Sequence, residues 1–390
     1  MIEYFKVEDF AQVITGGTPS TKNKAYWEDG HIPWLNSGEL NQDIIVSSRN
    51  HITSIGLEKS AAKLMPKDSV LIALTGATTG VVGYLTFEAC ANQSVTGILP
   101  SEKHFPKFLF YYLKSIRPQV LNDAYGGAQP HISQGYVKQL KIPLPPLGEQ
   151  KKIAAILDAT DDYRQKTKAL IDKYDQLTQS LFLDMFGDPV TNPRRFEIVT
   201  VRDIIEEAKY GTSSKADENG TFPYLRMNNI TYKGHMNYDN LKFINIADDQ
   251  LHKYETKKGD ILFNRTNSKE LVGKTGIITT DEKMVLAGYL IRVRMKEGYN
   301  PYFLWSHLNS RWAKLTLENM CKSIVGMANI NAQELQNLLV MNPPLKIQNQ
   351  FAERVQAIEA QKTKAQASLA QAEDLFNSLL QRAFKGELTN

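Results

Sequence analysis

The sequence predicts an α+β protein in which two related globular regions are joined by two long helices that form an antiparallel coiled coil. Three observations lead to this prediction. The chain repeats itself at a nearly constant interval, each copy contains short apolar runs separated by turn residues, and each copy ends in a long stretch of heptad-spaced residues. The length of 390 residues also exceeds what one ordinary hydrophobic core organises.

The internal repeat is clearest around two Pro-Pro-Leu tripeptides. Residues 131–157 align with residues 329–355, so that Ile132 and Gln150 fall on Ile330 and Gln348, 198 residues further on. Earlier segments match in the same order at slightly smaller offsets, as insertions in loops would produce. The expected boundaries are a first globular repeat at 1–147, a helix at 148–188, a second globular repeat at 189–345 and a helix at 346–390. We call the globular regions repeat 1 and repeat 2.

Within each repeat, short runs rich in β-formers are bounded by Gly, Asn and Thr. The runs predict strands at Ser69–Leu74, Gly80–Leu85, Val95–Leu99, Asp260–Phe263, Lys274–Ile278 and Leu290–Val293. A helix is expected after each set, at FPKFLFYYLKSI (105–116) and NPYFLWSHLNSRW (300–312). Each repeat is therefore expected to be a curved sheet flanked by small helices.

The two long helices are predicted from heptad spacing in segments without proline or internal glycine. The expected seam of the second helix is Phe351, Val355, Ile358, Lys362, Ala365, Leu369, Ala372, Phe376, Leu379 and Ala383. The expected seam of the first is Ile153, Ile156, Thr160, Tyr163, Thr167, Leu170, Tyr174, Leu177 and Leu181. At about 38 residues each helix would be roughly 57 Å long and would need a partner for its stripe. The other copy is the nearest partner, and the alternative is that each helix packs only on its own repeat.

The segment MNPPLKIQNQ (341–350) resembles the tetrapeptide with which amino-methylating enzymes hold adenine. The duplication argues against this function for Asn342, because the first copy has Leu144 at the matching position. No aromatic residue follows the prolines, and no glycine-rich cofactor loop follows a strand. We therefore interpret Pro-Pro-Leu as a stiff hinge that ends a strand and starts a helix. A stand-alone adenine methyltransferase and a protein-binding scaffold are the alternatives that remain.

Composition excludes several other classes of protein. A net charge of +4 is mildly basic and permits a polyanionic partner. Cys90 and Cys321 are far apart and form no CxxC pair, which argues against structural zinc or a disulfide framework. No long apolar window is present, so we expect a cytoplasmic chain with no membrane partner. We predict no catalytic residue and no metal site, since no arrangement of nucleophile, histidine and acid is legible.

Polar loops at corresponding places in the two repeats are suited to base edges and phosphates. Asn and Gln pair with adenine, Arg and Lys pair with guanine, and Ser, Thr and glycine-flanked amides bind phosphate. In repeat 1 the expected DNA-binding residues are Thr18, Ser20, Lys22, Asn36, Ser37, Thr75, Thr78, Thr79, Asn92, Gln93, Gln129 and His131. In repeat 2 they are Ser213, Lys215, Arg226, Asn228, Asn229, Asn264, Arg265, Asn267, Lys269, Lys274 and Asn329.

With the duplication, the hinge-helix PPLGEQKKIAAILD, the strand GDILFNR and the segment GATTGVVG…ANQSV in view, the chain resembles the specificity subunit of a type I restriction-modification enzyme. The resemblance covers essentially all residues. It implies two target-recognition domains that each read one half of a bipartite, asymmetric sequence in double-stranded DNA, with the helices as a spacer. Repeat 2 departs from the pattern, since AGYL stands where repeat 1 has ANQS.

The resemblance also implies partners and cofactors. Two methyltransferase subunits would bind the helices and nearby surfaces, and restriction subunits with translocase activity would bind outside them. This chain would hold no cofactor, and S-adenosylmethionine, ATP and Mg would reside on the partner subunits. In that family the subunit has no active site, which agrees with the absence of a legible one here.

Overall fold

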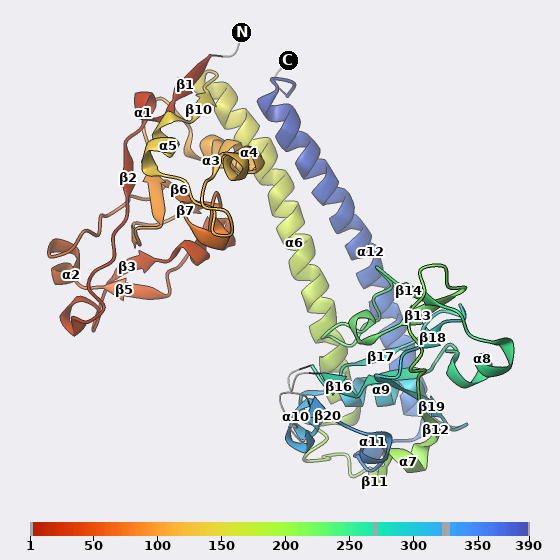
Figure 1. Ribbon diagram of the computed structural model, residues 1–390. Helices are drawn as coiled ribbons and strands as arrows, with labels where there is room; N and C mark the ends of the chain where they lie inside the picture. The colour runs from red at the N-terminus through yellow and green to blue at the C-terminus, as the bar shows by residue number, and fades with distance from the viewer. Residues whose placement is uncertain (1–2, 268–270, 322–327, 389–390) are drawn as a thin grey trace. The chain divides into compact units, whose positions relative to one another are not determined.

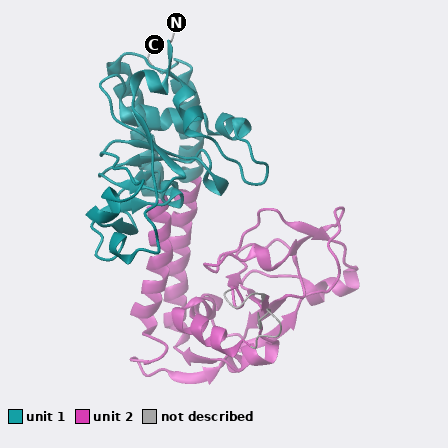
Figure 2. Cartoon of the chain, turned by 60° about the vertical axis from the view of Figure 1, so that its left-hand side comes forward, with its two compact units in different colours: residues 1–167, 368–390 teal, residues 168–367 magenta. Residues whose placement is uncertain are grey.

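The computed structural model describes residues 3–267, 271–321 and 328–388. The chain divides into two compact units, Met1–Thr167 with Ser368–Asn390 and Lys168–Ala367 (Figure 2). Both divisions fall inside long helices, since α6 (Leu147–Phe186) and α12 (Leu345–Phe384) each contribute to both units (Figure 1). Within the described ranges no helix is apolar over a length that would cross a lipid bilayer.

Repeat 1 contains a five-stranded sheet in the order β2-β9-β6-β7-β4, a three-stranded sheet β5-β3-β8 and a strand pair β1-β10. The strands are β1 (Tyr4–Lys6), β2 (Val13–Thr15), β3 (Ile32–Leu35), β4 (Ile44–Ile45), β5 (Asn50–Ile52), β6 (Val70–Ala73), β7 (Val82–Leu85), β8 (Cys90–Ala91), β9 (Val95–Ile98) and β10 (Lys141–Pro143). The helices are α1 (Val7–Phe10), α2 (Ser54–Glu58), α3 (Pro106–Ser115), α4 (Arg117–Asp123) and α5 (Gln134–Gln139), with 3-10 helices η1 (Lys24–Tyr26), η2 (Ser37–Gln42) and η3 (Gly76–Thr78).

Repeat 2 contains a four-stranded sheet β12-β19-β15-β17, a three-stranded sheet β14-β13-β18 and the strand pairs β11-β21 and β16-β20. The strands are β11 (Glu197–Thr200), β12 (Ile205–Tyr210), β13 (Phe222–Leu225), β14 (Lys242–Ile244), β15 (Ile261–Asn264), β16 (Thr266–Asn267), β17 (Thr275–Ile277), β18 (Val285–Leu286), β19 (Leu290–Met295), β20 (Ala328–Asn329) and β21 (Leu339–Asn342). The helices are α7 (Val201–Ile204), α8 (Asp248–Tyr254), α9 (Pro301–Asn309), α10 (Arg311–Met320) and α11 (Ala332–Gln336), with the 3-10 helix η4 (Met227–Asn229).

The two repeats share one strand topology, which confirms the duplication. The order β2-β9-β6-β7 in repeat 1 corresponds to β12-β19-β15-β17 in repeat 2. Both smaller sheets combine one antiparallel and one parallel pairing, with Trp34 opposite Cys90 in the first and Tyr224 opposite Val285 in the second. All six predicted strands are present within one or two residues of their expected ends.

In each repeat we call the larger sheet the main sheet, which has five strands in repeat 1 and four in repeat 2. One helix of each repeat joins this sheet to the long helices. Helix α3 begins at Pro106 and α9 at Pro301, where a proline at the first helical position leaves no N–H unsatisfied. Phe108 of α3 and Phe303 of α9 are both buried. Phe108 shares a core with β6 and α6, and Phe303 shares one with β15 and both long helices. The polar loops described below are thus built on sheets that are anchored to α6 and α12.

The long helices pair along their lengths in antiparallel fashion, as predicted (Figure 1). In one unit the Tyr163 hydroxyl lies 2.7 Å from the Ser368 hydroxyl. In the other, the Phe186 ring packs 5.1 Å from that of Phe351, near the end of α6 and the start of α12. The predicted seam of α12 is confirmed, because every seam residue is buried or half-buried in the expected alternation of four and three.

The predicted seam of α6 is confirmed at five of its nine positions, which are buried or half-buried, and is wrong at the other four. Four of its members, Ile156, Tyr163, Leu170 and Leu177, are between 38% and 54% exposed. The buried and half-buried positions that alternate by three and four are Ala154, Leu157, Asp161, Arg164, Lys168, Ile171, Asp175, Thr178 and Phe182. The physical reason for the difference is that the observed seam of α6 includes charged residues held in ion pairs, which an apolar pattern does not detect. The exposed residues form a stripe with seven-residue spacing, which we call the α6 stripe.

Candidate nucleic-acid interface

In repeat 1 the predicted loops meet at one edge of the main sheet. Strands β2 and β6 end at this edge while β9 and β7 begin there, because neighbouring strands in β2-β9-β6-β7 are antiparallel. Backbone hydrogen bonds join the loops in series. Gly17 N–H donates to Ala91 O at 2.9 Å, Leu74 N–H donates to Ser94 O at 2.7 Å, and Ile132 N–H donates to Leu74 O at 2.9 Å.

The side chains at one end of this edge come from three loops. The Thr18 hydroxyl donates to Gln93 Oε1 at 2.5 Å. The Asn92 N–H donates to Leu35 O at 2.9 Å, which brings Asn36 and Ser37 beside Asn92. Ser20 and Lys22 follow in the same exposed loop as Thr18. The structure therefore brings the predicted residues 18, 36–37 and 92–93 together, with Ser20 and Lys22 further along the first of these loops.

The other end of the edge is formed by residues 75–79 and 125–131. Gly76 N–H donates to Pro130 O at 3.0 Å, and the Thr79 hydroxyl donates to the same carbonyl at 2.6 Å. The Tyr125 and His131 rings lie 3.6 Å apart, and Tyr125 is 55% exposed. Tyr125 was not among the predicted residues. Its place beside two glycines in a polar loop is the sequence signal that could have identified it.

Repeat 2 uses the same frame with different residues. Gly211 N–H donates to Leu290 O, Ala287 N–H to Leu225 O, Arg265 N–H to Tyr289 O and Ile330 N–H to Arg265 O. These bonds bring together the loops that carry Ser213, Lys215, Arg226, Arg265 and Asn329. Thr266 and Asn267 pair with Asn329 and Ala328 as β16 and β20, where repeat 1 has an isolated bridge between Thr75 and His131. Lys269 lies outside the described residues.

Arg265 is held by its surroundings. Its guanidinium lies 4.8 Å from the centroid of the Tyr210 ring, and the Tyr210 hydroxyl accepts a hydrogen bond from Ala332 N–H at 2.8 Å. The Arg265 Nη1 lies 3.5 Å from Gly288 O, and its Nε is buried without a hydrogen-bond partner. Tyr289, 55% exposed, follows Gly288 at the same edge. Tyr210 and Tyr289 are further residues that loop composition alone did not identify.

Four of the predicted residues are buried and stabilise the loops from inside, namely Thr79, Asn229, Asn264 and Lys274. Thr79 holds Pro130 as described, and the Asn229 amide bridges Arg226 N–H and Asn237 O. Asn264 Nδ2 donates to Leu271 O at 3.2 Å. Apart from these four, all predicted side chains whose exposure the structure describes are half-buried or exposed.

Lys274 is the clearest case of a cation with an internal role. Its ammonium donates to Met227 O at 2.8 Å and to Ile230 O at 2.7 Å, and burial lowers its pKa. Lys314 reaches Gly273 O from α10, and burial together with nearby Lys274 lowers the pKa of Lys314 to about 8. Both lysines therefore support the loop around Gly273.

A polar cluster joins repeat 2 to both long helices, at some distance in sequence from the loop edge. Carboxylate and imidazole atoms of Asp175, His235 and Glu359 lie within 4.8 Å of one another. The Lys362 ammonium donates to Asp175 and lies 2.8 Å from His235 Nε2. Burial alone would raise the pKa of Asp175, but hydrogen bonds from His235, Lys233 and Lys362 hold it well below its usual range. The ammonium already supplies the cation that these groups would attract.

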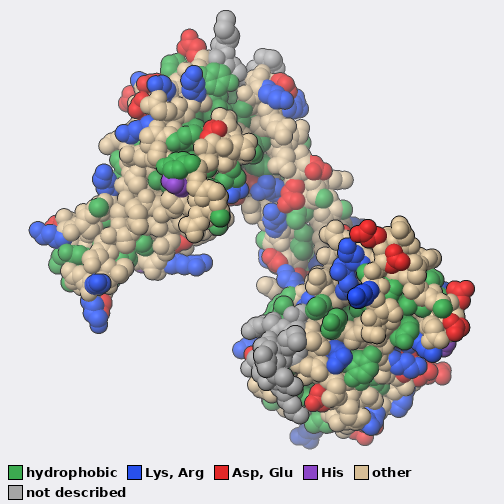
Figure 3. All heavy atoms as spheres, in the orientation of Figure 1, with side chains coloured by type: hydrophobic (Ala, Val, Ile, Leu, Met, Phe, Trp, Pro, Cys, Tyr) green, Lys and Arg blue, Asp and Glu red, His purple; other side chains and the backbone are tan. Residues whose placement is uncertain are grey.

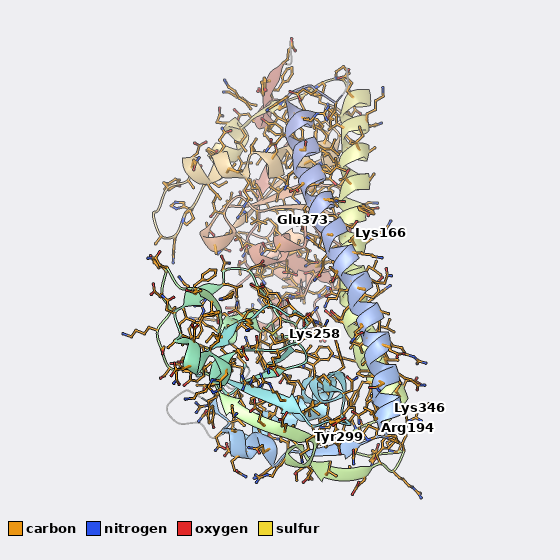
Figure 4. All side chains as sticks on the ribbon, turned by 90° about the vertical axis from the view of Figure 1, so that its right-hand side faces the viewer. Lys166, Arg194, Lys258, Tyr299, Lys346 and Glu373 are labelled. Carbon is orange, nitrogen blue, oxygen red and sulfur yellow. The ribbon has the colours of Figure 1, made fainter. Side chains whose placement is uncertain are left out.

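Charge at the molecular surface is mixed. On the face shown in Figure 3, basic side chains stand among acidic ones on both units. Lys166 on α6, labelled in Figure 4, lies 3.8 Å from Asp162 and both are mostly exposed. Asn342, which resembled a methyltransferase residue, is the last residue of β21 and donates to Glu197 Oε2 on the paired strand at 3.3 Å.

Known proteins place these features in a family. Residues 2–173 and 193–372 match the family described as the type I restriction modification DNA specificity domain. The specificity subunit of the type I restriction enzyme EcoKI from Escherichia coli K12 is 27% identical, over 93% of this chain and 84% of that protein. The MjaIX specificity subunit from Methanocaldococcus jannaschii is 25% identical, over 98% of this chain and 92% of that protein.

Solved structures agree on the fold. The S subunit of the type I restriction-modification system from M. genitalium aligns with a TM-score of 0.62 at 16% identity, over 98% of this chain and 96% of that one. A chain solved in work on complex assembly and conformational transition of the type I R-M system aligns with a TM-score of 0.59 at 18% identity, over 99% and 98% of the two chains. Since the family match covers both halves of the sequence, the chain belongs to the type I restriction-modification DNA specificity family.

Proposed function

We propose that this chain recognises a bipartite, asymmetric DNA site and assembles the methyltransferase and restriction subunits of a type I complex around it. The observation that carries the proposal is the shared loop edge. Both repeats bring the same set of loops to the same edge of the main sheet through matching backbone hydrogen bonds, but the side chains differ. One frame with two sets of side chains is what an asymmetric two-part site requires.

The exposed loop residues would contact the DNA, and the buried ones would hold the loops. In repeat 2 the Arg265 fork, already ordered by the Tyr210 ring, suits a guanine edge in the major groove. In repeat 1 the exposed residues at this edge are mainly hydroxyls and amides, together with the exposed ring of Tyr125. Amides suit adenine and hydroxyls suit phosphates, so the two half-sites would differ in base composition.

The paired helices would act as the spacer between the two half-sites. Each repeat is anchored to its own part of the helix pair, and the bases between the half-sites would not be read. We expect this gap to be a little under one helical turn, roughly 5–9 bp.

The α6 stripe supports the proposed partners. Ile156, Tyr163, Leu170 and Leu177 are at least one-third exposed on a helix whose seam is already filled by α12. A heptad-spaced apolar stripe favours another helix as its occupant, and we assign it to the methyltransferase subunits, with restriction subunits outside them. S-adenosylmethionine, ATP and Mg would belong to these partners, in the cytoplasm, and this chain would be non-catalytic.

The experiment that tests the proposal exchanges residues 1–147 for those of another family member, in a complex with the methyltransferase subunits. Sequencing of methylated bases should show that one half-site changes while the other half-site and the gap persist. Changes in both half-sites would contradict the proposal. Labelled S-adenosylmethionine incubated with DNA and this chain alone supplies the second measurement, and methyl transfer by the isolated chain would contradict the non-catalytic role.

DNA binding with and without the methyltransferase subunits tests where affinity arises. A net charge of +4 and the mixed surface supply little phosphate neutralisation, so binding by the chain alone should be weak and strongly reduced by salt. Equal affinity in the presence and absence of the methyltransferase subunits would contradict the expectation that these subunits supply much of the DNA affinity.

A further inference from the structure

The glutamine after each Pro-Pro-Leu hinge is buried and makes the same two hydrogen bonds in both repeats. Gln150, 0% exposed, accepts a hydrogen bond from Phe105 N–H at 2.7 Å and donates from Nε2 to Pro145 O at 2.8 Å. Gln348, 1% exposed, accepts from Asn300 N–H at 2.9 Å and donates to Pro343 O at 2.8 Å.

Each of these bonds links a different part of the molecule. Phe105 and Asn300 are the N-cap residues of α3 and α9, the helices that pack on the main sheets. Pro145 and Pro343 are the first prolines of the hinges. The glutamines themselves lie in the first turns of α6 and α12. One side chain in each repeat therefore joins the globular repeat, the hinge and the long helix.

Only a side chain with an acceptor and a donor on one planar group satisfies this site. A glutamine amide offers both, whereas a carboxylate would face the proline carbonyl with a second acceptor. Because both glutamines are buried, a substitution that removes either bond also leaves a backbone group unpaired. The polar links that other side chains of α3 and α9 make to the long helices differ between repeats, with Lys107 bound to Asp158 at 2.7 Å in repeat 1 and Tyr302 bonded to Gln356 in repeat 2.

We propose that Gln150 and Gln348 are positioning residues that fix the angle between each globular repeat and its helix, and thereby set how strictly the protein measures the gap between half-sites. The loop edge lies on a sheet that moves with α3 or α9 as one packed body. A small rotation at the hinge would therefore shift the loops along the DNA without altering which bases they read. This inference rests on the proposed recognition of a bipartite site.

The test uses the full complex with methyltransferase subunits, carrying Gln150→Met, Gln348→Met or both. Methionine retains the length and the packing of glutamine but makes neither hydrogen bond. The DNA probes contain both half-sites with the native gap, or with a gap shortened or lengthened by one base pair. We expect the preference for the native gap over the altered gaps to fall about tenfold for each substitution, which lies within the net contribution of the two hydrogen bonds that it removes.

Two controls separate positioning from general stabilisation. Gln165→Met and Gln361→Met place the same substitution at exposed positions of α6 and α12 and should leave gap preference unchanged. Gln150→Leu and Gln348→Leu also remove both hydrogen bonds while retaining a side chain of similar size without charge, so they should relax gap preference in the same way, and they serve if a methionine variant fails to fold. Substitution of half-site bases should still abolish methylation in every variant that folds.

The outcomes distinguish this inference from the proposed function. If the methionine or leucine variants fold and bind all three gaps more weakly by one common factor, or retain the wild-type preference, the glutamines are merely structural and the inference is overturned. If the wild-type complex itself shows no preference among gap lengths, the bipartite recognition fails instead, and the inference fails with it.

Discussion

Repeat 1 and repeat 2 share the hydrogen bonds by which a glutamine of the long helix binds backbone atoms. The bonds between pairs of side chains that join each repeat to the long helices differ. In repeat 1, Lys107 and Tyr111 of α3 both bind Asp158 of α6, at 2.7 and 2.8 Å. In repeat 2, a loop from η4 to β14 reaches the helices as well, where Lys233 binds Asp172 and Asp175 at 2.7 and 2.8 Å. His235 and Lys362 complete this cluster, which we call the repeat 2 clasp.

The two copies of the duplication have retained bonds that end on backbone atoms and have diverged in bonds that end on side chains. The glutamine bonds and the loop-to-loop bonds end on backbone atoms, so they survive any change of the side chain at the partner position. The ion pairs end on side chains, and one substitution removes them. The loops diverged in the same way, because the backbone frame was retained while its exposed residues changed.

Acidification should weaken both repeats and is the largest effect we expect. Burial lowers the pKa of His104 in repeat 1 and of His307 in repeat 2 to about 4. An unfolded histidine titrates near 6.5, so the unfolded chain takes up a proton first as pH falls from 6.5 to 4. Stability is therefore lost in that window, by about 3 kcal/mol per histidine at its lower end.

Urea denaturation at several pH values measures this loss. His104→Gln and His307→Gln should each flatten the dependence on pH by one histidine's share, whatever they do to stability at pH 7. An unchanged dependence in both variants would show that other groups control acid unfolding. A loss confined to one repeat would break the symmetry that the two buried histidines suggest.

Lys362→Met should destabilise repeat 2 selectively. The lysine is 4% exposed, and its removal leaves the Asp175 carboxylate with only Lys233 and His235 as partners. Removal of one member of a buried ion pair costs about 3 kcal/mol. Hydrogen exchange should report faster opening of repeat 2 and unchanged protection in repeat 1. The exposed Lys364→Met on the same helix is the control, and equal effects of the two variants would refute the clasp's contribution.

Arg265→Ala should weaken recognition of one half-site only. Loss of a bidentate contact with a base corresponds to about 2 kcal/mol, or roughly 30-fold in binding. Competition binding by the full complex should show relaxed preference at one base pair of the half-site read by repeat 2. The exposed Arg202→Ala carries the same charge change on α7 and should have no such effect. A uniform loss across DNA sequences would instead identify Arg265 as a phosphate contact.

The sequence was sufficient to predict the repeated frame but not the burial within it. Strand positions and hinges followed from apolar spacing and proline, which act locally, whereas the order of the strands in the sheets was not predicted. The internal role of Lys274 could not be predicted, because nothing in the loop sequence distinguishes it from an exposed surface lysine. Its partners Met227 O and Ile230 O come from a loop more than 40 residues away. Likewise, alignment identified Gln150 and Gln348 as a matched pair but gave no sign of the backbone groups that they join.

The seam of α6 illustrates a different limit. Nine positions at alternating spacings were expected to face α12, and five of them are buried or half-buried, but the other four are exposed. The covered face of α6 also includes the positions one residue later. These include Asp161, bound to Arg164 at 3.0 Å, and Asp175, bound to Lys362. The Arg164 guanidinium also lies 4.4 Å from the Phe376 ring of α12. A hydrophobicity pattern cannot identify seam positions that are occupied by paired charges. At four positions it therefore predicted apolar residues that remain exposed as the α6 stripe.

The α6 stripe gives the smallest expected effect. Leu170 and Leu177 are 41% and 48% exposed, so their complete burial under a partner helix would contribute about 1 kcal/mol each. Leu170→Ser and Leu177→Ser should each weaken binding of the methyltransferase subunits by about fivefold, measured by titration calorimetry. Leu375→Ser is matched in residue type, is 54% exposed on α12 and lies outside the stripe. Since all three variants carry the same cost in helix propensity, a loss of partner binding shared by Leu375→Ser would place the docking surface elsewhere on the helix pair.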